Sequence, residues 1–213
     1  MRQPLPKIRK PGLNLLLALL VVDVLLALLI LGLNGYNRHS APTMVVGQGI
    51  KAISQGHTGS GTPSGRGNQL ALENLMPGDI LLGGNRGSTY GGFTHAALYA
   101  GEGQAWQGWL TLGISKVDAV KFRDYDRACI LRVAATPDQR ETVLREVESH
   151  QGQLFFPLPF KSGERIWNCS KIIWLPFFKL GLDLDSFQDI WVTPDSIYRS
   201  SLVEIIAEDG EIW

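Results

Sequence analysis

The 213-residue sequence predicts an α+β fold, and two observations support this prediction. The first is a series of short apolar segments bounded by turn-forming residues, which is typical of strands. The second is a pair of longer segments with helix start or stop signals, which flank some of these strands. No internal repeat is present. The predicted strands cover 79–82, 94–100, 104–109, the region around Ile114, 129–134 and 202–208, and the predicted helices cover 136–153 and 168–181.

The N-terminal region contains an apolar run, Leu15–Leu33. A helix of about 20 residues at roughly 1.5 Å per residue spans the hydrocarbon core of a bilayer. Four basic residues precede the run, and the first charge after it is Arg38. Cytoplasmic flanks carry an excess of Lys and Arg. We therefore expect a cytoplasmic N-terminus (1–12), a transmembrane anchor (13–34) in the cytoplasmic membrane, and the rest of the chain outside the cytoplasm.

A cleaved signal peptide is the alternative interpretation of this run. Signal peptides have an apolar core of about 7–15 residues followed by small residues at the cleavage site. The observed run is longer, and the following NGYNRHS offers no such site, which favours an uncleaved anchor. Asp23 is unusual at mid-membrane, where a carboxylate is costly, and we interpret it as a tolerated exception.

The segment 35–68 is rich in Gly, Ser, Thr and Pro, and it predicts a flexible linker with a short helix or strand at 44–53. The folded domain is expected at 69–213. It begins with a helical turn near Leu70, and a Pro-Gly pair then precedes the first strand. Glu102 and Gly103 predict a tight turn between two antiparallel strands.

The two predicted helices carry their own boundary signals. Thr136 can cap the first helix, and Pro137 suits its first turn. In the second helix, Pro176 predicts a kink or an end. The TPDS sequence around Asp195 predicts a turn, and Asp79 is expected to shape the entry of the first strand.

Cys169 lies where an extended segment gives way to the second helix. Amide hydrogens and the dipole at a helix N-terminus favour a thiolate and can bind an oxyanion, so Cys169 is a candidate nucleophile. A disulfide with Cys129 stays open, because the domain is expected outside the cytoplasm. Cys129 itself lies in an apolar strand, where a lone cysteine usually packs as a small hydrophobic residue.

A cysteine nucleophile needs a base, and the base needs an orienting group. His95 begins a strand after a glycine-rich loop, which makes it the best candidate base. Gln107 lies on the next strand, and antiparallel pairing can bring it beside His95 as the orienting group. The three other histidines are better explained as bystanders or as a helix-end residue: His39, His57 and His150.

The segments MPGDILL, FTHAALYAG, WNCSKIIW and WVTPDSIY, in this order, resemble permuted papain-like cysteine amidases of the YiiX/YaeF type, relatives of NlpC-type cell-wall peptidases. The resemblance covers residues 75–206. It implies a permuted papain-like (NlpC-type) fold, an antiparallel sheet or partial barrel packed against helices. It also implies that Cys169 is the nucleophile and His95 the base. Gln107 falls where many members carry a glutamate or another polar residue. As a neutral amide, it supplies no charge to stabilise imidazolium.

The resulting hypothesis is a membrane-anchored cysteine amidase or peptidase acting on a cell-wall peptide or another acyl-amide. Ser88, Tyr90 and Asn168 are candidate substrate-binding residues. No metal or other cofactor is expected, because no pair of His or Cys has ligand spacing. The 20 basic and 20 acidic residues balance, which argues against a nucleic-acid partner. The alternatives are a lipid-directed acyltransferase or thioesterase, and an inactive binding module of the same fold.

Overall fold

The computed structural model describes residues 17, 18, 20–26, 28, 43–59, 63 and 65–211. The chain divides into two compact units, Met1–Ser40 and Ala41–Trp213. In the first unit the described residues are helical, and the rest of the predicted anchor (13–34) lies outside the described residues. Within the described part of the chain, no helix has the length and apolar character that a membrane crossing requires.

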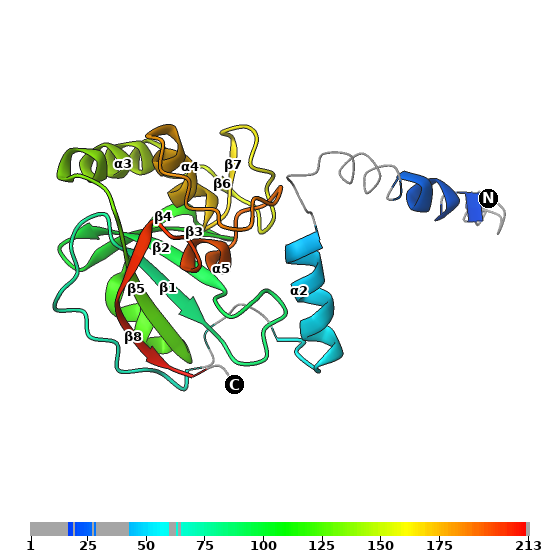
Figure 1. The fold of residues 1–213 in the computed structure, drawn as a ribbon, viewed down its shortest axis with the longest axis horizontal. Helices are drawn as coiled ribbons and strands as arrows, with labels where there is room; N and C mark the ends of the chain where they lie inside the picture. Colours follow the sequence, from blue (N-terminus) through cyan, green and yellow to red (C-terminus); the bar gives the residue numbers. More distant parts are fainter. Residues whose placement is uncertain are drawn as a thin grey trace, which may run out of the picture. The chain divides into compact units, whose positions relative to one another are not determined.

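The second unit begins with helix α2 (Thr43–Ser54) and continues into a mixed α+β domain (Figure 1). The predicted fold class is confirmed at this level: an antiparallel sheet packs against helices. The elements after α2 are β1 (Ile80–Gly84), β2 (His95–Gly101), β3 (Gln104–Trp109), β4 (Gly113–Asp118), the 3-10 helix η1 (Ala119–Asp124), β5 (Arg127–Val133), α3 (Pro137–Ser149), β6 (Leu154–Phe155), β7 (Ile166–Trp167), α4 (Lys171–Lys179), α5 (Pro194–Tyr198) and β8 (Val203–Gly210).

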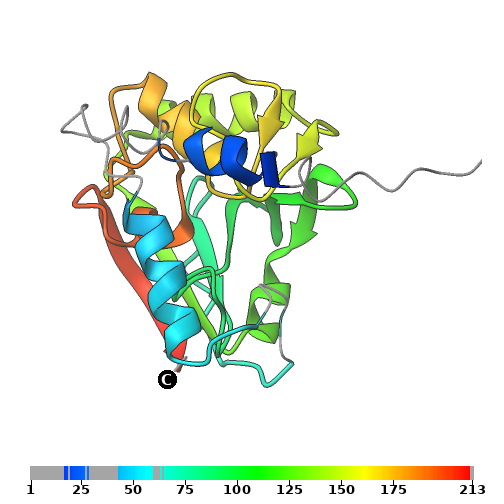
Figure 2. The same ribbon diagram turned by 90° about the vertical axis from the view of Figure 1, so that its right-hand side faces the viewer.

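The main sheet has the strand order β4-β3-β2-β1-β5-β8, and every neighbouring pair is antiparallel. The short strands β6 and β7 form a separate parallel pair. Helices α3 and α4 lie side by side above the sheet, and Figure 2 shows the same arrangement from the side. β1 and β2 pair so that Gly83 faces His95, which sets the position of His95 at one end of the sheet.

Side chains alternate between the two faces of the sheet and form two apolar clusters. On β2, Ala96 and Leu98 belong to the cluster that includes α3 and α4. Ala97, between them, belongs to the opposite cluster, which contains Phe122 of η1 and Tyr125. Because both faces of the central strands are covered, β1, β2 and β5 are mostly apolar, whereas the edge strands β4 and β8 are partly exposed and carry charged residues.

Several elements differ from the sequence-based expectations. The TPDS segment is helix α5 rather than a simple turn, because Thr193 and Ser196 form a reciprocal capping box. The predicted cap Thr136 is confirmed at α3, where it accepts a hydrogen bond from Gln139 N. The helix η1 and the pair β6–β7 were not predicted, since six-residue and two-residue segments carry too little periodicity. Within the range predicted as a linker, the short helix or strand expected at 44–53 is helix α2.

Asp79 has the structural role that the sequence predicted for it. Its carboxylate is fully buried and accepts two hydrogen bonds from Arg132, with Nε–Oδ1 and Nη2–Oδ2 distances of 2.9 and 2.7 Å. Arg140 of α3 adds a third contact at 3.1 Å, and the backbone amide of Met76 adds a fourth at 2.8 Å. The cluster therefore fastens the start of β1 to β5 and to α3.

Replacing Asp79 with Ala should lower the free energy of unfolding by about 3 kcal/mol, because both guanidinium groups lose their buried partner. Chemical denaturation at neutral pH measures the effect. Asp124→Ala is the control, since this aspartate is exposed and lies 3.8 Å from Lys121, a contact worth about 0.5 kcal/mol or less. Equal losses in the two variants would contradict the role given to Asp79.

Candidate active site

Cys169 lies just before helix α4, and Asn168 fixes its position. The Asn168 Oδ1 atom accepts hydrogen bonds from the amides of Ser170 and Lys171, at 3.1 and 2.6 Å. Its Nδ2 group donates to the carbonyls of Pro157 and Val192, both at 3.2 Å. Asn168, and not Ser170, is therefore the residue whose side chain caps the helix.

The Cys169 sulfur is buried and reduced, and Cys129 is also a free, buried thiol. Burial raises the pKa of the Cys169 thiol, because a thiolate loses its hydration. Hydrogen bonds from the backbone amide of Ala96, from the Ser170 hydroxyl and from the amides of Cys169 and Ser170 act in the opposite direction. The helix N-terminus thus favours the thiolate as expected, but desolvation outweighs it and the resting group is a neutral thiol.

His95 is the first residue of β2 and is held by polar and aromatic contacts. Its Nε2 atom lies 2.7 Å from Oε1 of Gln107 on β3, so Nε2–H donates to the amide oxygen. The ring packs edge-on to Trp109 at 5.2 Å and stacks with Phe122 at 5.8 Å between centroids. With Nε2 engaged by Gln107, Nδ1 is the nitrogen left to accept a proton.

Burial lowers the pKa of His95 to about 4, and the hydrogen bond from His95 to Gln107 offsets only part of this effect. A neutral amide accepts the Nε2 proton but adds no negative charge to stabilise imidazolium. At neutral pH the site therefore holds a neutral imidazole and a neutral thiol, and not a preformed thiolate–imidazolium pair.

One pocket of about 500 Å³ is lined by both His95 and Cys169. The two residues come from distant parts of the sequence, as the sequence analysis required. The rest of the lining consists of Gly59, Thr89, Tyr90, Thr94, Trp109, Leu110, Thr111, Phe155 and Pro157. The volume is that of ordinary small-molecule sites, which span about 300–1,000 Å³.

The candidate substrate-binding residues occupy different places. Tyr90 lines the pocket, and its hydroxyl lies 3.4 Å from the Pro157 carbonyl. Ser88 lines a neighbouring pocket instead and accepts a hydrogen bond from the Tyr90 amide at 3.1 Å. Asn168 is buried, and its amide is used for capping rather than for lining the pocket. Gln107 acts on the pocket only through His95.

Asp195 is a positioning residue that the sequence analysis assigned only to a turn. Its carboxylate accepts hydrogen bonds from the backbone amides of Gly92 and Phe93, both at 2.8 Å. These residues lie three and two positions before His95, so helix α5 fixes the loop that leads into the base. Gly91 has φ 139° and stands so close to this carboxylate that a Cβ atom would collide with it. No local sequence signal marks a carboxylate used 100 residues away.

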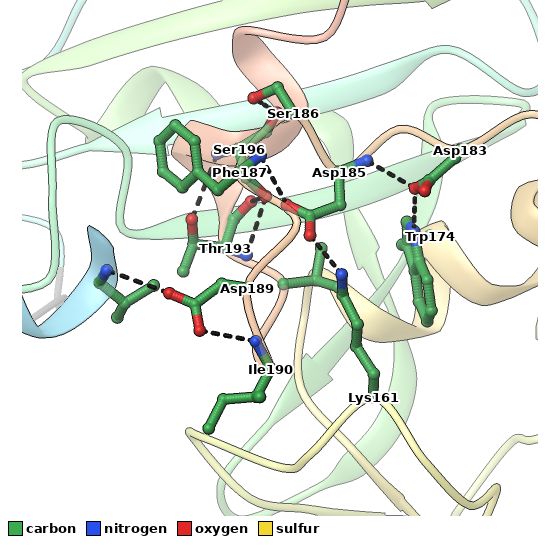
Figure 3. A network of polar contacts seen from close by, with 12 residues as sticks. Lys161, Trp174, Asp183, Asp185, Ser186, Phe187, Asp189, Ile190, Thr193 and Ser196 are labelled. Carbon is green, nitrogen blue, oxygen red and sulfur yellow. Dashed lines mark hydrogen bonds and ion pairs between the residues drawn. The ribbon is translucent and has the colours of Figure 1, made fainter. Parts of the chain in front are cut away.

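The loop before α5 is itself held by a polar network (Figure 3). Asp185 forms an ion pair with Lys161, and Asp183 accepts a hydrogen bond from Trp174 Nε1 at 2.8 Å. Asp189 accepts a hydrogen bond from the amide of Val45, in the first turn of α2, at 3.3 Å. A carboxylate at a helix N-terminus is stabilising, so this contact fastens α2 to the domain.

The buried His95 predicts a loss of stability on mild acidification. The unfolded imidazole has a pKa near 6.5 and the folded one near 4, so the unfolded chain binds the proton more readily. The stability contributed by neutral His95 is complete above pH 6.5, falls between pH 6.5 and 4, and totals about 3 kcal/mol. Denaturant unfolding of wild type and His95→Phe across this range measures the difference, and parallel curves would contradict the burial of a neutral imidazole.

Comparison with known proteins adds little to this geometry. No protein-family model and no curated protein matches the chain. Among solved structures, the metalloprotein YiiX from Escherichia coli O157:H7 resembles it with 11% sequence identity and a TM-score of 0.48. The similarity covers 64% of this chain and 98% of that chain. Such a likeness concerns the fold at most, and it assigns neither an activity nor a metal to this chain.

Proposed function

We propose that this chain is a cysteine hydrolase of the permuted papain-like type, which cleaves an amide bond through an acyl-enzyme. The observation that carries the proposal is the shared pocket, in which a cysteine at a helix N-terminus accompanies a histidine oriented by Gln107. Nucleophile, base and orienting group are the three parts that this chemistry needs.

The reaction begins from the neutral pair. As the Cys169 sulfur attacks the carbonyl carbon, the thiol proton moves to Nδ1 of His95, and the carbonyl oxygen becomes an oxyanion. Collapse of this intermediate breaks the C–N bond, and His95 returns the proton to the leaving amine. Water then attacks the thioester, with His95 again accepting and returning a proton. The products are the free acid and the regenerated thiol.

Backbone amides supply the candidate oxyanion site. The amides of Ala96 and Cys169 lower the pKa of the Cys169 thiol, as donors close to the sulfur do, whereas the Ser170 amide is also held by Asn168 Oδ1. Donors fixed before reaction stabilise the developing charge without reorganisation. The Tyr90 hydroxyl faces the same pocket, and burial raises its pKa, so it stays a neutral donor.

A lipid-directed acyltransferase or thioesterase is the second candidate, and exposed apolar side chains favour it. Leu110 lines the pocket and is 70% exposed, and Phe156 and Phe160 are 56% and 60% exposed. The FFPLPF segment thus presents Phe156 and Phe160 to solvent rather than to the core. In LPFFKLGL, Leu175 and Phe177 are buried, and Phe178 is 46% exposed. An apolar rim beside a catalytic pocket suits an acyl chain.

The proposal includes an anchor at residues 13–34 and a catalytic domain outside the cytoplasmic membrane. Its support is the apolar run and the positive flank of the sequence. A cell-wall peptide is the leading substrate class on this placement. The alternative from another functional class is an inactive binding module. It is motivated by Gln107, the neutral partner of His95.

Parallel assay of the full chain against peptide amides and lipid esters tests the proposal, with products separated as amines or fatty acids. Release of amine that disappears in Cys169→Ala supports the amidase, whereas release of fatty acid supports the lipid-directed acyltransferase or thioesterase. If both wild type and Cys169→Ser bind a substrate tightly but neither turns it over, the result would support the inactive binding module.

A further inference from the structure

A second cluster of chemically reactive groups lies at the end of helix α3, apart from the residues that line the candidate catalytic pocket. It consists of Glu146 and His150 from this end of the helix and Glu164 from the loop between β6 and β7. Residues four apart on a helix share a face, so Glu146 and His150 point the same way. One ligand atom from each of the three residues lies within 4.8 Å of the others.

His150 supplies the observation that sets this cluster apart from a surface ion pair. The residue is only 9% exposed, and its ring packs on Trp167 with centroids 4.3 Å apart. Neither Nδ1 nor Nε2 has a hydrogen-bond partner among the described residues. Buried polar atoms in native proteins are nearly always paired, so an imidazole with two unpaired nitrogens requires an explanation.

A cation already stands between the two carboxylates. The Lys179 ammonium lies 2.7 Å from Glu146 Oε1 and 2.9 Å from Glu164 Oε1. This ammonium neutralises the carboxylates but makes no hydrogen bond to the imidazole. The Lys179 side chain is 39% exposed, so it can turn into solvent and leave the position between the carboxylates.

We propose that Glu146, His150 and Glu164 form a binding site for a divalent transition metal such as Zn²⁺, which replaces the Lys179 ammonium. The metal accepts the lone pair of one imidazole nitrogen and one oxygen from each carboxylate. An imidazole ligand selects against Mg²⁺ and Ca²⁺, which prefer oxygen ligands alone. Three protein ligands leave a fourth position for water on the exposed side of Glu164.

The site has a defined structural consequence. It joins the end of α3 to the loop before β7, and Trp167 of β7 lies two residues before Cys169. Metal binding would therefore clamp the segment that leads into the nucleophile. The sequence analysis missed the cluster because it searched for pairs of His or Cys, and here one imidazole combines with two carboxylates.

Calorimetric titration of the full chain with Zn²⁺ tests the proposal. The titration uses a Cys169→Ser background, so that the Cys169 thiol beside His95 cannot bind the metal. We expect one saturable Zn²⁺ site whose affinity depends on His150 and Glu164. His150→Phe keeps the packing on Trp167 but removes both nitrogens, and it should weaken affinity by at least about 10-fold. Glu164→Gln should weaken the Zn²⁺ affinity as well. Because Glu164 is half-exposed, this variant should fold normally even if His150→Phe does not.

Lys179→Met is the most discriminating variant. If the metal replaces the ammonium, removing the competing charge should tighten Zn²⁺ binding. It should also raise the metal-induced increase in melting temperature. X-ray absorption of the bound Zn²⁺ should show one imidazole nitrogen together with oxygen ligands. The proposal is overturned by the absence of a saturable site, by equal affinities of wild type, His150→Phe and Glu164→Gln, or by unchanged affinity in Lys179→Met.

Discussion

Replacing Cys169 with Ala should lower kcat/KM on an accepted substrate by about 10⁴-fold or more, because no other group in the pocket can form the acyl-enzyme. The side chain is nearly fully buried, and Ala keeps its backbone and Cβ. The loss should therefore fall on turnover rather than on folding. Steady-state kinetics measure it, and circular dichroism establishes that the variant has the wild-type fold.

Cys129→Ala is the matched control for this variant. Cys129 is an equally buried free thiol, but it lies on β5 paired with Leu82 of β1 and does not line the catalytic pocket. Its replacement should lower the free energy of unfolding by about 1 kcal/mol through lost packing and leave kcat/KM near the wild-type value. Similar kinetic losses in both variants would contradict the assignment of Cys169.

Replacing His95 with Ala should lower kcat/KM by about 10²- to 10⁴-fold, the usual contribution of a positioned general base. Because the pKa of His95 is about 4, the wild-type acid limb of kcat/KM should lie at correspondingly low pH. In His95→Ala this limb should disappear. A pH profile between 4 and 9 measures both features.

Gln107→Glu tests how His95 is oriented. A carboxylate in place of the amide oxygen, which lies 2.7 Å from Nε2, would stabilise imidazolium and raise the pKa of His95. The acid limb should move to higher pH while activity at neutral pH is kept or increased. A collapse of activity with the fold intact would show that Gln107 has another role.

The coarse fold and the contact between His95 and Gln107 were accessible from the sequence because local patterns encode them, whereas the shared pocket of Cys169 and His95 joins segments far apart in the sequence. The hairpin turn at Glu102 and Gly103 specifies that β2 and β3 are antiparallel, and this pairing brings His95 beside Gln107. The capping signals at Thr136 and the position of Cys169 before a helix are local as well. Each of these inferences needed only residues within twelve positions of one another.

The remaining features depend on contacts between distant segments. Asp195 reaches the amides before His95 only because α5 packs beside that loop, and Lys171 becomes a buried ammonium because the carbonyls of Phe160, Ser162 and Ile166 surround it. The neutral resting state of the Cys169–His95 pair also follows from burial, which no sequence window reports. Helix α2 lies where the sequence left a short helix or strand open at 44–53, but its contact with Asp189 on a distant loop has no local signal.

The most direct test of the central claim is the intact mass of the full chain after brief reaction with an activated acyl-amide, followed by peptide mapping. We predict one acyl group per chain, attached to Cys169. This acylation should be slow in His95→Ala and absent in Cys169→Ala. Acylation of Cys129, or labelling of Cys169 at the same rate with and without His95, would contradict a nucleophile activated by this histidine.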